Sequence, residues 1–318
     1  MTAAAGNTFY LGWEPALMEW LQAHLGQGAI SAISFFSSFG EELILILLLG
    51  ILYWGWDKQM GKSVGITVLM GMVWNCMIKN IALRRRPYFD HEGIDIYRVV
   101  EPGADIYDIS AQGYSFPSGH STNAAGAYWA AALNIGKKWV KALAVLLFLL
   151  VGFSRVVVGA HYPTDVLCGW LLGLAVAMVI SLLERKIHNP LVLYGILLVT
   201  ALPGLFYCKS SDYFTSFGLM IGFFAGSLIE EKYVRFENTG NPLRILLRVL
   251  GGLAIYLLLS VVLKLPFSKA FLESGTMAAM LVRSARYAII AFVDFCIYPM
   301  LFQKTAALQL PGDKKAAA

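Results

Sequence analysis

Long runs of apolar residues, joined by short polar connections, dominate the pattern along this chain. Nine of these runs approach the roughly 20 residues that a helix needs to cross a bilayer. They lie at Glu42–Trp56, Val64–Leu83, Ser118–Ile135, Val140–Val158, Val166–Leu183, Leu191–Cys208, Phe214–Ile229, Leu243–Leu263 and Met277–Phe302. The strict apolar–polar alternation of an outer-membrane strand is absent. The pattern therefore predicts an all-α fold, a polytopic bundle of transmembrane helices.

The segment before the first run has a different character. The stretch PALMEWLQAHL places its apolar residues on one face at helical spacing, which is typical of a helix lying in the membrane interface. The FFSSFG stretch that follows fits either a re-entrant turn or the start of a long, tilted first helix. No basic region followed by an apolar stretch opens the chain, so we expect no cleavable signal peptide.

Composition supports the membrane interpretation. The chain is 58% hydrophobic and only 14% charged, whereas soluble domains carry roughly 25% charged residues. The net charge of +5 comes without a basic tail, so no nucleic-acid partner is expected. The four cysteines all fall in apolar segments without CxxC spacing, which favours buried small hydrophobes over a redox or metal site.

Lys and Arg are distributed unevenly between alternate loops. The connections after the first, third, fifth, seventh and ninth runs hold most of them, and the other connections are nearly uncharged or acidic apart from an RRRP cluster. Because basic loops stay in the cytoplasm, the N-terminus is predicted outside and the C-terminus inside a cell (plasma) membrane.

The first chemically informative group ends the second run. Lys79 and Arg86 stand seven positions apart, which predicts that both lie on one helix face, and Pro87 is expected to end that helix. A charge one turn inside a membrane helix is costly, which favours a functional role over simple snorkelling. Arg84 and Arg85 are interpreted as rim charges.

The second group is YSFPSGHST, at the start of the third run. Pro117 is predicted at the first helical position, followed by Ser118, Gly119 and His120. A helix N-terminus offers free backbone donors and a dipole that favours an anion. A plain helix cap is the alternative, but it leaves the adjacent imidazole unexplained.

The third group is FSRVVVGAHYPTDV, between the fourth and fifth runs. Arg155 approaches the end of one helix, and His161 and Asp165 are four residues apart. That spacing lets the carboxylate accept a hydrogen bond from one ring nitrogen and leaves the other free as a nucleophile. The predicted topology brings all three groups to one membrane face, where cations and backbone donors favour a phosphate ligand.

These motifs resemble a known family. KNIALRRRP, PSGH and SRVVVGAHYPTD resemble the three signatures of the type 2 phosphatidic acid phosphatase superfamily, which includes lipid phosphate phosphatases and vanadium haloperoxidases. The resemblance covers about Phe35 to Leu183 and implies a six-helix phosphatase core, leaving about three additional C-terminal helices. The expected organisation is an interfacial segment at 1–40, the core at 41–210, additional transmembrane helices at 211–305 and a cytoplasmic tail at 306–318.

The resemblance also implies roles for individual residues. His161 would be the nucleophile that forms a phosphohistidine, Asp165 would orient it, and His120 would protonate the leaving group. The residues expected to hold the phosphate oxygens are Lys79, Arg86, Ser118, Gly119 and Arg155. No metal and no cofactor are expected.

The predicted function is hydrolysis of a lipid phosphate or diphosphate at the extracytoplasmic face of the bilayer. Undecaprenyl pyrophosphate leads by family resemblance, followed by phospholipid, sphingoid and isoprenoid phosphates. A lipid-linked phosphotransferase is the alternative enzyme, whereas a non-enzymatic transporter leaves the three motifs unexplained. The sequence carries no indication of oligomeric state.

Two further regions hold unusual polar residues. The connection Tyr88–Ser115 contains six carboxylates against the single basic residue Arg98, and reads either as a solvated loop or as a lid that shapes the entrance. In the last run, Arg283 and Arg286 are expected to pair with Glu273 or lipid phosphate, or to grip the substrate headgroup. Asp294 is expected to find a partner inside the bundle.

Overall fold

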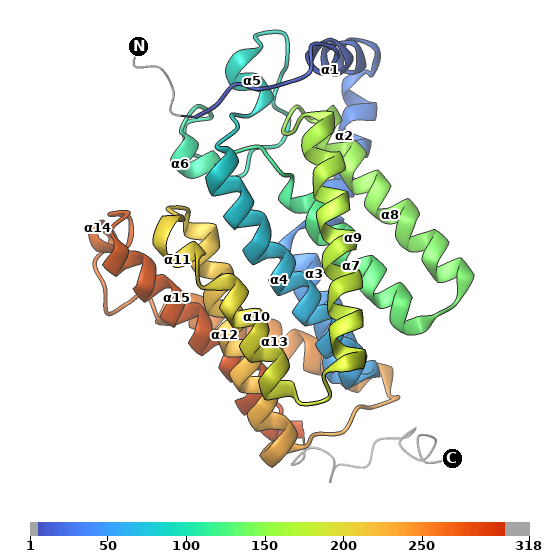
Figure 1. The fold of residues 1–318 in the computed structure, drawn as a ribbon, viewed down its shortest axis with the longest axis vertical. Helices are drawn as coiled ribbons and strands as arrows, with labels where there is room; N and C mark the ends of the chain where they lie inside the picture. Colours follow the sequence, from blue (N-terminus) through green and yellow to red (C-terminus); the bar gives the residue numbers. More distant parts are fainter. Residues whose placement is uncertain (1–5, 303–318) are drawn as a thin grey trace. The chain divides into compact units, whose positions relative to one another are not determined.

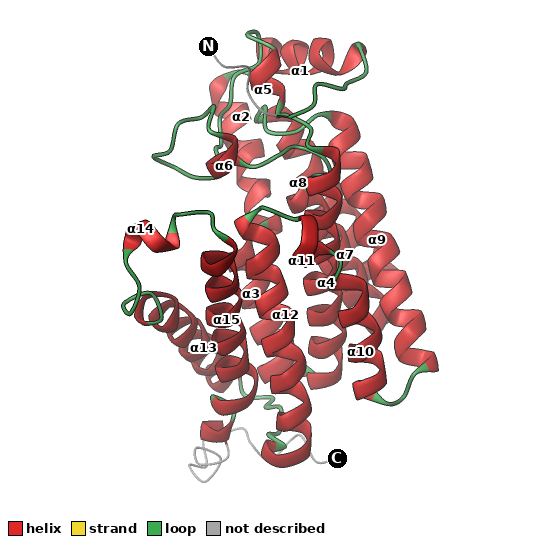
Figure 2. Cartoon of the chain, turned by 60° about the vertical axis from the view of Figure 1, so that its left-hand side comes forward, coloured by secondary structure: helices red, strands yellow, loops and turns green. Residues whose placement is uncertain are grey.

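A computed structural model describes residues 6–302. In that part of the chain all the regular secondary structure is helical (Figure 1). The only β-type pairing among these residues is an isolated parallel bridge between Asn7 and Arg84. Figure 2 shows the same helices joined by loops. The residues form two compact units, and α4 (Lys58–Ala82) contributes to both of them.

Unit 1 comprises the described residues up to Ile44 together with Trp74–Val179. Its elements are α1 (Trp13–His24), α2 (Gln27–Phe35), the 3₁₀ helix η1 (Phe36–Gly40), the start of α3 (Glu42–Gly50), the end of α4, α5 (Pro87–Asp90), α6 (Ile109–Gln112), α7 (Gly119–Ile135), α8 (Lys138–Val157) and most of α9 (Pro163–Lys186). Helices α7 and α8 pack on each other, and both contact η1.

Unit 2 comprises Leu45–Val73 and the described residues from Ile180 onwards. Besides parts of α3, α4 and α9, it holds the π-helix η2 (Ile51–Trp56), α10 (Pro190–Ala201), α11 (Gly204–Tyr207), α12 (Ser211–Ile229), the π-helix η3 (Glu230–Val234), α13 (Pro242–Val262), α14 (Lys269–Leu272), α15 (Met277–Phe292) and the π-helix η4 (Val293–Ile297).

All nine predicted apolar runs contain helices. In the described part of the chain, seven helical segments are long and apolar enough to cross a membrane, and an eighth arises if the bent pair Gln27–Gly40 and Glu42–Trp56 forms one span. Helix α7 has 17 residues, which is at the short end of the range for a membrane span. The predicted all-α, polytopic class is confirmed.

Local sequence signals set several helix ends. Helix α7 begins after Ser118, whose side chain accepts from the Ser121 backbone N–H at 3.4 Å, and it ends before Gly136, which has φ of 75°. Helix α10 begins with Pro190 at its first position, after Asn189. The predicted start of α7 at Pro117 was therefore wrong by two residues.

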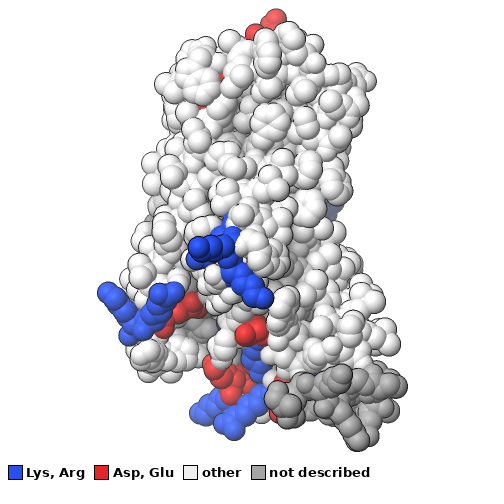
Figure 3. Space-filling view, turned by 90° about the vertical axis from the view of Figure 1, so that its right-hand side faces the viewer, with Lys and Arg blue, Asp and Glu red and all other residues white. Residues whose placement is uncertain are grey.

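The surface carries many large apolar side chains, as expected for contact with lipid. Leu171 on α9 is 66% exposed, and Leu258 on α13 is 61% exposed. On the face shown in Figure 3, charged side chains are few and gather in patches, and the rest of the drawn surface is uncharged. Bilayer hydrocarbon is the solvent that makes this distribution favourable.

Within unit 2, α12 and α15 pack along their length through glycines. A Cβ at Gly222 would lie 2.1 Å from the Ala288 carbonyl oxygen, and one at Gly218 would lie 2.2 Å from that of Ser284. Small residues of this kind let helix backbones approach closely, which stabilises helix pairs in membranes.

Gly222→Ala is therefore expected to destabilise the protein by about 1–3 kcal/mol, because the new methyl group meets backbone that cannot yield. Thermal unfolding in detergent, followed by tryptophan fluorescence, measures the change. Gly195→Ala on α10 is the matched control, since a Cβ there meets nothing within 4 Å. Equal melting temperatures for the two variants would contradict the importance of this packing.

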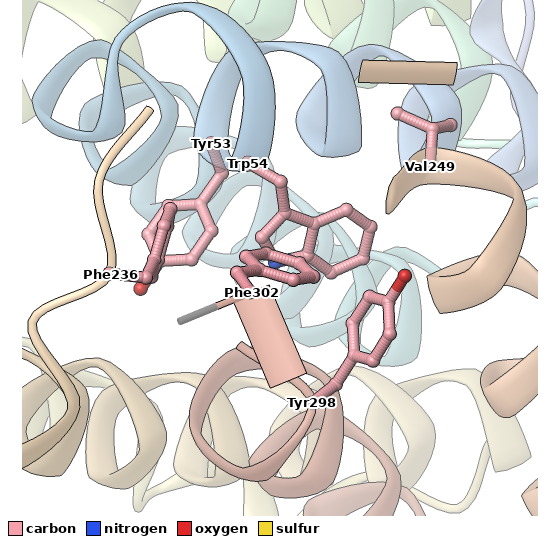
Figure 4. Close-up of a cluster of buried hydrophobic side chains, with 6 residues drawn as sticks. All are labelled: Tyr53, Trp54, Phe236, Val249, Tyr298 and Phe302. Atoms are coloured by element: carbon pink, nitrogen blue, oxygen red, sulfur yellow. The ribbon is translucent and has the colours of Figure 1, made fainter. Parts of the chain in front are cut away.

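A cluster of buried, mostly aromatic side chains lies in unit 2 and is shown in Figure 4. Its buried members are Tyr53, Trp54, Phe236, Val249, Tyr298 and Phe302. Beside it, the buried Glu230 accepts from Lys58 Nζ at 2.7 Å and from the Tyr53 hydroxyl at 3.3 Å. The cluster and this ion pair fix the chain around η2 and η3.

The unusual polar residues of the last run make contacts that were not predicted. Arg283 donates to the Thr215 hydroxyl at 3.3 Å, and Arg286 donates to the Ser260 carbonyl at 3.3 Å. Asp294 is buried in η4, and its Oδ1 has no hydrogen-bond partner among the described residues. The expectation that Asp294 would be paired is wrong for that oxygen.

Candidate active site

All eight predicted site residues lie in unit 1. They come from three places: the end of α4 with the segment after it, the start of α7, and the end of α8 with its connection to α9. The three motifs are thus gathered in one compact unit, as the predicted topology required. Their catalytic roles stay predictions.

His161 lies in the short connection between α8 and α9 and is 2% exposed. Burial lowers the pKa of its imidazole well below the usual value, and the nearby positive charges of Arg86, Arg155 and Lys79 lower it further. A neutral imidazole at neutral pH keeps one ring nitrogen unprotonated, as a nucleophile requires.

A serine stands between His161 and Asp165. The Nδ1 atom of His161 is 3.7 Å from Asp165 Oδ2, which is too long for a hydrogen bond. Ser115 Oγ donates to the same Oδ2 at 2.5 Å and lies 3.2 Å from Nδ1. Because the Ser115 hydroxyl donates its proton to the carboxylate, its oxygen can only accept a hydrogen bond from His161 Nδ1–H. The neutral imidazole therefore carries its proton on Nδ1, and Nε2 is unprotonated. The predicted direct contact was wrong, since the spacing of His161 and Asp165 does not reveal the intervening hydroxyl.

Asp165 is fully buried at the start of α9 and is held from several sides. Its Oδ2 also accepts from the Tyr162 backbone N–H at 2.8 Å. Its Oδ1 accepts from Arg84 Nη1 at 2.7 Å. The Asp165 backbone carbonyl accepts from the Ser118 N–H at 3.0 Å, which joins the second motif to the third.

The interpretation of Arg84 as a rim charge was wrong. Its side chain is 1% exposed and lies between two carboxylates, Glu14 and Asp165. Three consecutive arginines give no indication of which one turns inward. Arg85, by contrast, is partly exposed and pairs with Asp90 at 2.6 Å.

The end of α4 also differs from the prediction. The helix stops at Ala82, and Leu83 adopts a left-handed φ of 51°, so Arg86 lies in the connection and not on the helix. Its guanidinium donates to the carbonyls of Gln112 and Gly113 through Nε, each at 3.0 Å. Its Nη1 donates to the Ala160 carbonyl at 3.0 Å, directly before His161.

Arg155 is 1% exposed near the end of α8. Its Nη1 donates to the Ser37 hydroxyl of η1 at 3.1 Å. Its buried Nε has no hydrogen-bond partner among the described residues. A buried cation with an unsatisfied donor is favoured where an anionic ligand binds, because the ligand supplies the missing acceptor.

The start of α7 completes the group. Ser118 is fully buried and caps the helix, and the Gly119 and His120 amides belong to the first turn, which lacks intrahelical acceptors. A Cβ at Gly119 would meet only Asn75 Oδ1, at 3.8 Å, so its backbone is accessible. The side chain of His120 is 25% exposed, which leaves the imidazole open to a ligand.

Two charged residues near His120 were not predicted. Glu41 Oε1 is 4.0 Å from His120 Nε2 and is ion-paired with Arg98. Arg98 also donates to the Ser34 carbonyl at 2.9 Å and to the Ser38 hydroxyl at 3.0 Å. It thereby ties the connection 88–115 to α2 and η1. Arg98 stands out in the sequence as the single basic residue of an acidic connection. Its partner Glu41 could not be predicted, because it is far away along the chain.

A metal site requires several ligating side chains grouped together. Among residues 6–302, no three or more His, Cys, Asp or Glu side chains are grouped so that they could hold a metal ion. Metal independence stays a prediction. Around the two imidazoles lie guanidiniums, one ammonium, backbone amides and the carboxylates of Glu41 and Asp165.

Fold and site together define a polytopic helical membrane protein with two histidines in a cationic site. The chain belongs to the PAP2 superfamily: the model of that family matches residues 61–188. A second model, described as the transmembrane extension of PAP2 superfamily phosphatases, matches residues 214–309. The additional C-terminal helices thus correspond to a recognised extension.

Several known proteins are similar to this chain. Undecaprenyl-diphosphatase of Sulfolobus acidocaldarius is 30% identical over 44% of this chain and 63% of its own length. Undecaprenyl-diphosphatase BcrC of Bacillus subtilis is 31% identical over 48% of this chain and 72% of its own length. The crystal structure of a transmembrane PAP2-type phosphatidylglycerolphosphate phosphatase from Bacillus subtilis covers 54% of this chain and 85% of its own, at 26% identity and a TM-score of 0.43.

Proposed function

We propose that this protein is an integral membrane phosphatase that hydrolyses a lipid phosphate or diphosphate through a phosphohistidine on His161. The observation that carries the proposal is the position of this buried imidazole. The charges of Arg86, Arg155 and Lys79 act on it, and Ser115 holds its Nδ1. That arrangement suits attack by Nε2 on a phosphorus atom whose oxygens the cations bind.

The reaction proceeds in two displacements. His161 Nε2 attacks phosphorus, the bond to the leaving oxygen breaks, and His120 gives that oxygen a proton. A water molecule then attacks the phosphohistidine, the phosphorus–nitrogen bond breaks, and His120 takes the proton from the water. Arg86 and Arg155, with the first-turn amides of Gly119 and His120, stabilise the charge on the equatorial oxygens.

An isoprenoid diphosphate is the proposed substrate, at the extracytoplasmic face of the plasma membrane. Two relatives that match this chain are named undecaprenyl-diphosphatases, which supports the diphosphate class. The apolar helices would hold the lipid tail in the bilayer while the cationic site takes the headgroup. The uneven distribution of Lys and Arg among the loops supports the sidedness.

Phosphate release from a panel of lipids tests both parts. The panel contains farnesyl diphosphate, phosphatidate, phosphatidylglycerol phosphate and sphingosine phosphate, each with and without EDTA and orthovanadate. We expect farnesyl diphosphate to be hydrolysed fastest, EDTA to have little effect, and vanadate to inhibit because it mimics the five-coordinate transition state.

Right-side-out and inside-out vesicles decide the sidedness in the same assay. Added farnesyl diphosphate should release phosphate only with right-side-out vesicles. A faster reaction with phosphatidate would reassign the substrate class. Transfer of the phosphate to an added polyol acceptor, with little free phosphate, would indicate a phosphotransferase.

A further inference from the structure

A buried network of charges lies behind Asp165, and phosphate binding does not account for it. Arg84 Nη1 donates to Asp165 Oδ1 at 2.7 Å, and its Nη2 donates to Glu14 Oε2 at 3.0 Å. All three side chains are at most 1% exposed. We propose that Glu14 and Arg84 are positioning residues for the nucleophile, which orient Asp165 and keep its negative charge available to His161. This inference rests on the proposed role of His161.

The contacts that Arg84 makes require a guanidinium at this position. Each of its two terminal nitrogens serves a different carboxylate, and Nη1 also donates to Thr164 Oγ1 at 2.8 Å. The planar group lies 4.0 Å from the ring centroid of Tyr162 and 4.8 Å from that of Phe9. A lysine ammonium could not span both carboxylates while stacking between two rings.

Glu14, like Arg84, makes several hydrogen bonds that fix its side chain. Its Oε2 also accepts from the Leu11 N–H at 2.7 Å, and its Oε1 accepts from the N–H and the hydroxyl of Thr164 at 2.8 and 2.7 Å. Burial alone would raise the pKa of this carboxyl, but these hydrogen bonds and the charge of Arg84 outweigh it and lower the pKa. Glu14 is therefore ionised at neutral pH.

The N-terminal arm brings these groups together. The Asn7 N–H donates to the Leu83 carbonyl at 2.7 Å, and the Arg85 N–H donates to the Asn7 carbonyl at 2.9 Å. This bridge holds the chain around Leu83, where it leaves α4, and so turns Arg84 inward. The arm that ends in α1 thus supplies both the clamp on the Arg84 backbone and the second carboxylate.

The charge balance explains why two carboxylates are needed. If Arg84 faced Asp165 alone, the pair would be neutral, and His161 would face mainly positive charge. With Glu14 the network carries one net negative charge, which favours the cationic form of the imidazole as it takes up phosphorus. The charged and titratable groups that face His161 are Asp165, Lys79, Arg86, His120 and Arg155.

Glu14→Gln tests the inference, because it removes one charge and nearly preserves volume. We expect kcat to fall about 10- to 100-fold with KM changed less than about threefold, as is typical for loss of a residue that orients a reacting group. Removing a negative charge lowers the pKa of His161, so the acid limb of kcat/KM should move to lower pH by about half a unit to one unit. The assay uses whichever of farnesyl diphosphate and phosphatidate is hydrolysed faster.

Matched variants separate charge from folding. Glu14→Asp keeps the charge and should leave the acid limb at its wild-type pH even where kcat falls. Glu19→Gln makes the same charge change at an exposed position of α1 and should alter neither kcat nor the pH profile. Glu14→Gln combined with Arg84→Gln should return the acid limb toward the wild-type pH, because the network again carries one negative charge.

Two results would overturn the inference: a wild-type pH profile in Glu14→Gln, or a loss confined to KM with an unmoved acid limb. If Glu14→Gln does not fold, a shift of the acid limb in Glu14→Asp overturns it equally. His161→Ala in the same assay separates the two proposals. Turnover in that variant contradicts the proposed function, whereas a dead His161→Ala beside a fully active Glu14→Gln contradicts only the role of the network.

Discussion

His161→Ala is expected to reduce kcat by about 10⁴-fold or more, because it removes the proposed nucleophile that Ser115 holds. Vanadate should still bind to this variant, since Arg86, Arg155 and the start of α7 remain. Phosphate release and vanadate-dependent thermal stabilisation measure the two effects separately. The expected pattern is a protein that binds the phosphate mimic without turning over lipid.

The control for this variant is His24→Ala. His24 is exposed at the end of α1, where it stacks on the Trp20 ring and lies 2.8 Å from the Trp20 carbonyl, so its loss should leave kcat unchanged. Turnover within about tenfold of the wild-type rate in His161→Ala would remove His161 as the nucleophile. The phosphohistidine mechanism would then be wrong for this chain.

His120→Gln is expected to reduce kcat by about 10²- to 10⁴-fold with phosphatidate, whose alkoxide leaving group needs a proton. The loss should be smaller, about tenfold, with 4-nitrophenyl phosphate, because nitrophenolate leaves without protonation. Parallel kcat measurements with the two substrates give the ratio. The side chain is partly open to a ligand, as an acid at the leaving oxygen must be.

His161→Ala should show no such dependence on the leaving group, because the nucleophile is needed for every substrate. An equal loss with both substrates in His120→Gln would contradict the role of His120 as the acid. It would indicate instead that this imidazole binds phosphate or shapes the helix start.

The gathering of the three motifs was predictable because apolar runs of fixed length return the chain to one membrane face. The spans of α8 and α9 place Arg155 and Asp165 at adjoining helix ends, and the bounds follow closely from the hydrophobic pattern. The position of a residue in a helix or at a helix end follows from the local hydrophobic pattern.

The contacts behind the site were not predictable in the same way. Glu14 reaches Arg84, and Ser115 reaches Asp165, from distant parts of the chain. Neither the charge pattern nor the spacing indicates these partners. The end of α4 was missed for the same reason. Leu83 favours a helix, but the bridge from Asn7 holds it in a left-handed conformation.

The two parts of the connection 88–115 differ in how far their sequence is free to vary. Its final residues, Gln112 to Ser115, bind Arg86 through their carbonyls and Asp165 through a hydroxyl, while residues near Gly103 at its tip are exposed. Substitutions confined to the tip would therefore leave the contacts with Arg86 and Asp165 intact. Grafting the whole connection from a homologue would also replace the residues that hold Arg86 and Asp165 in place.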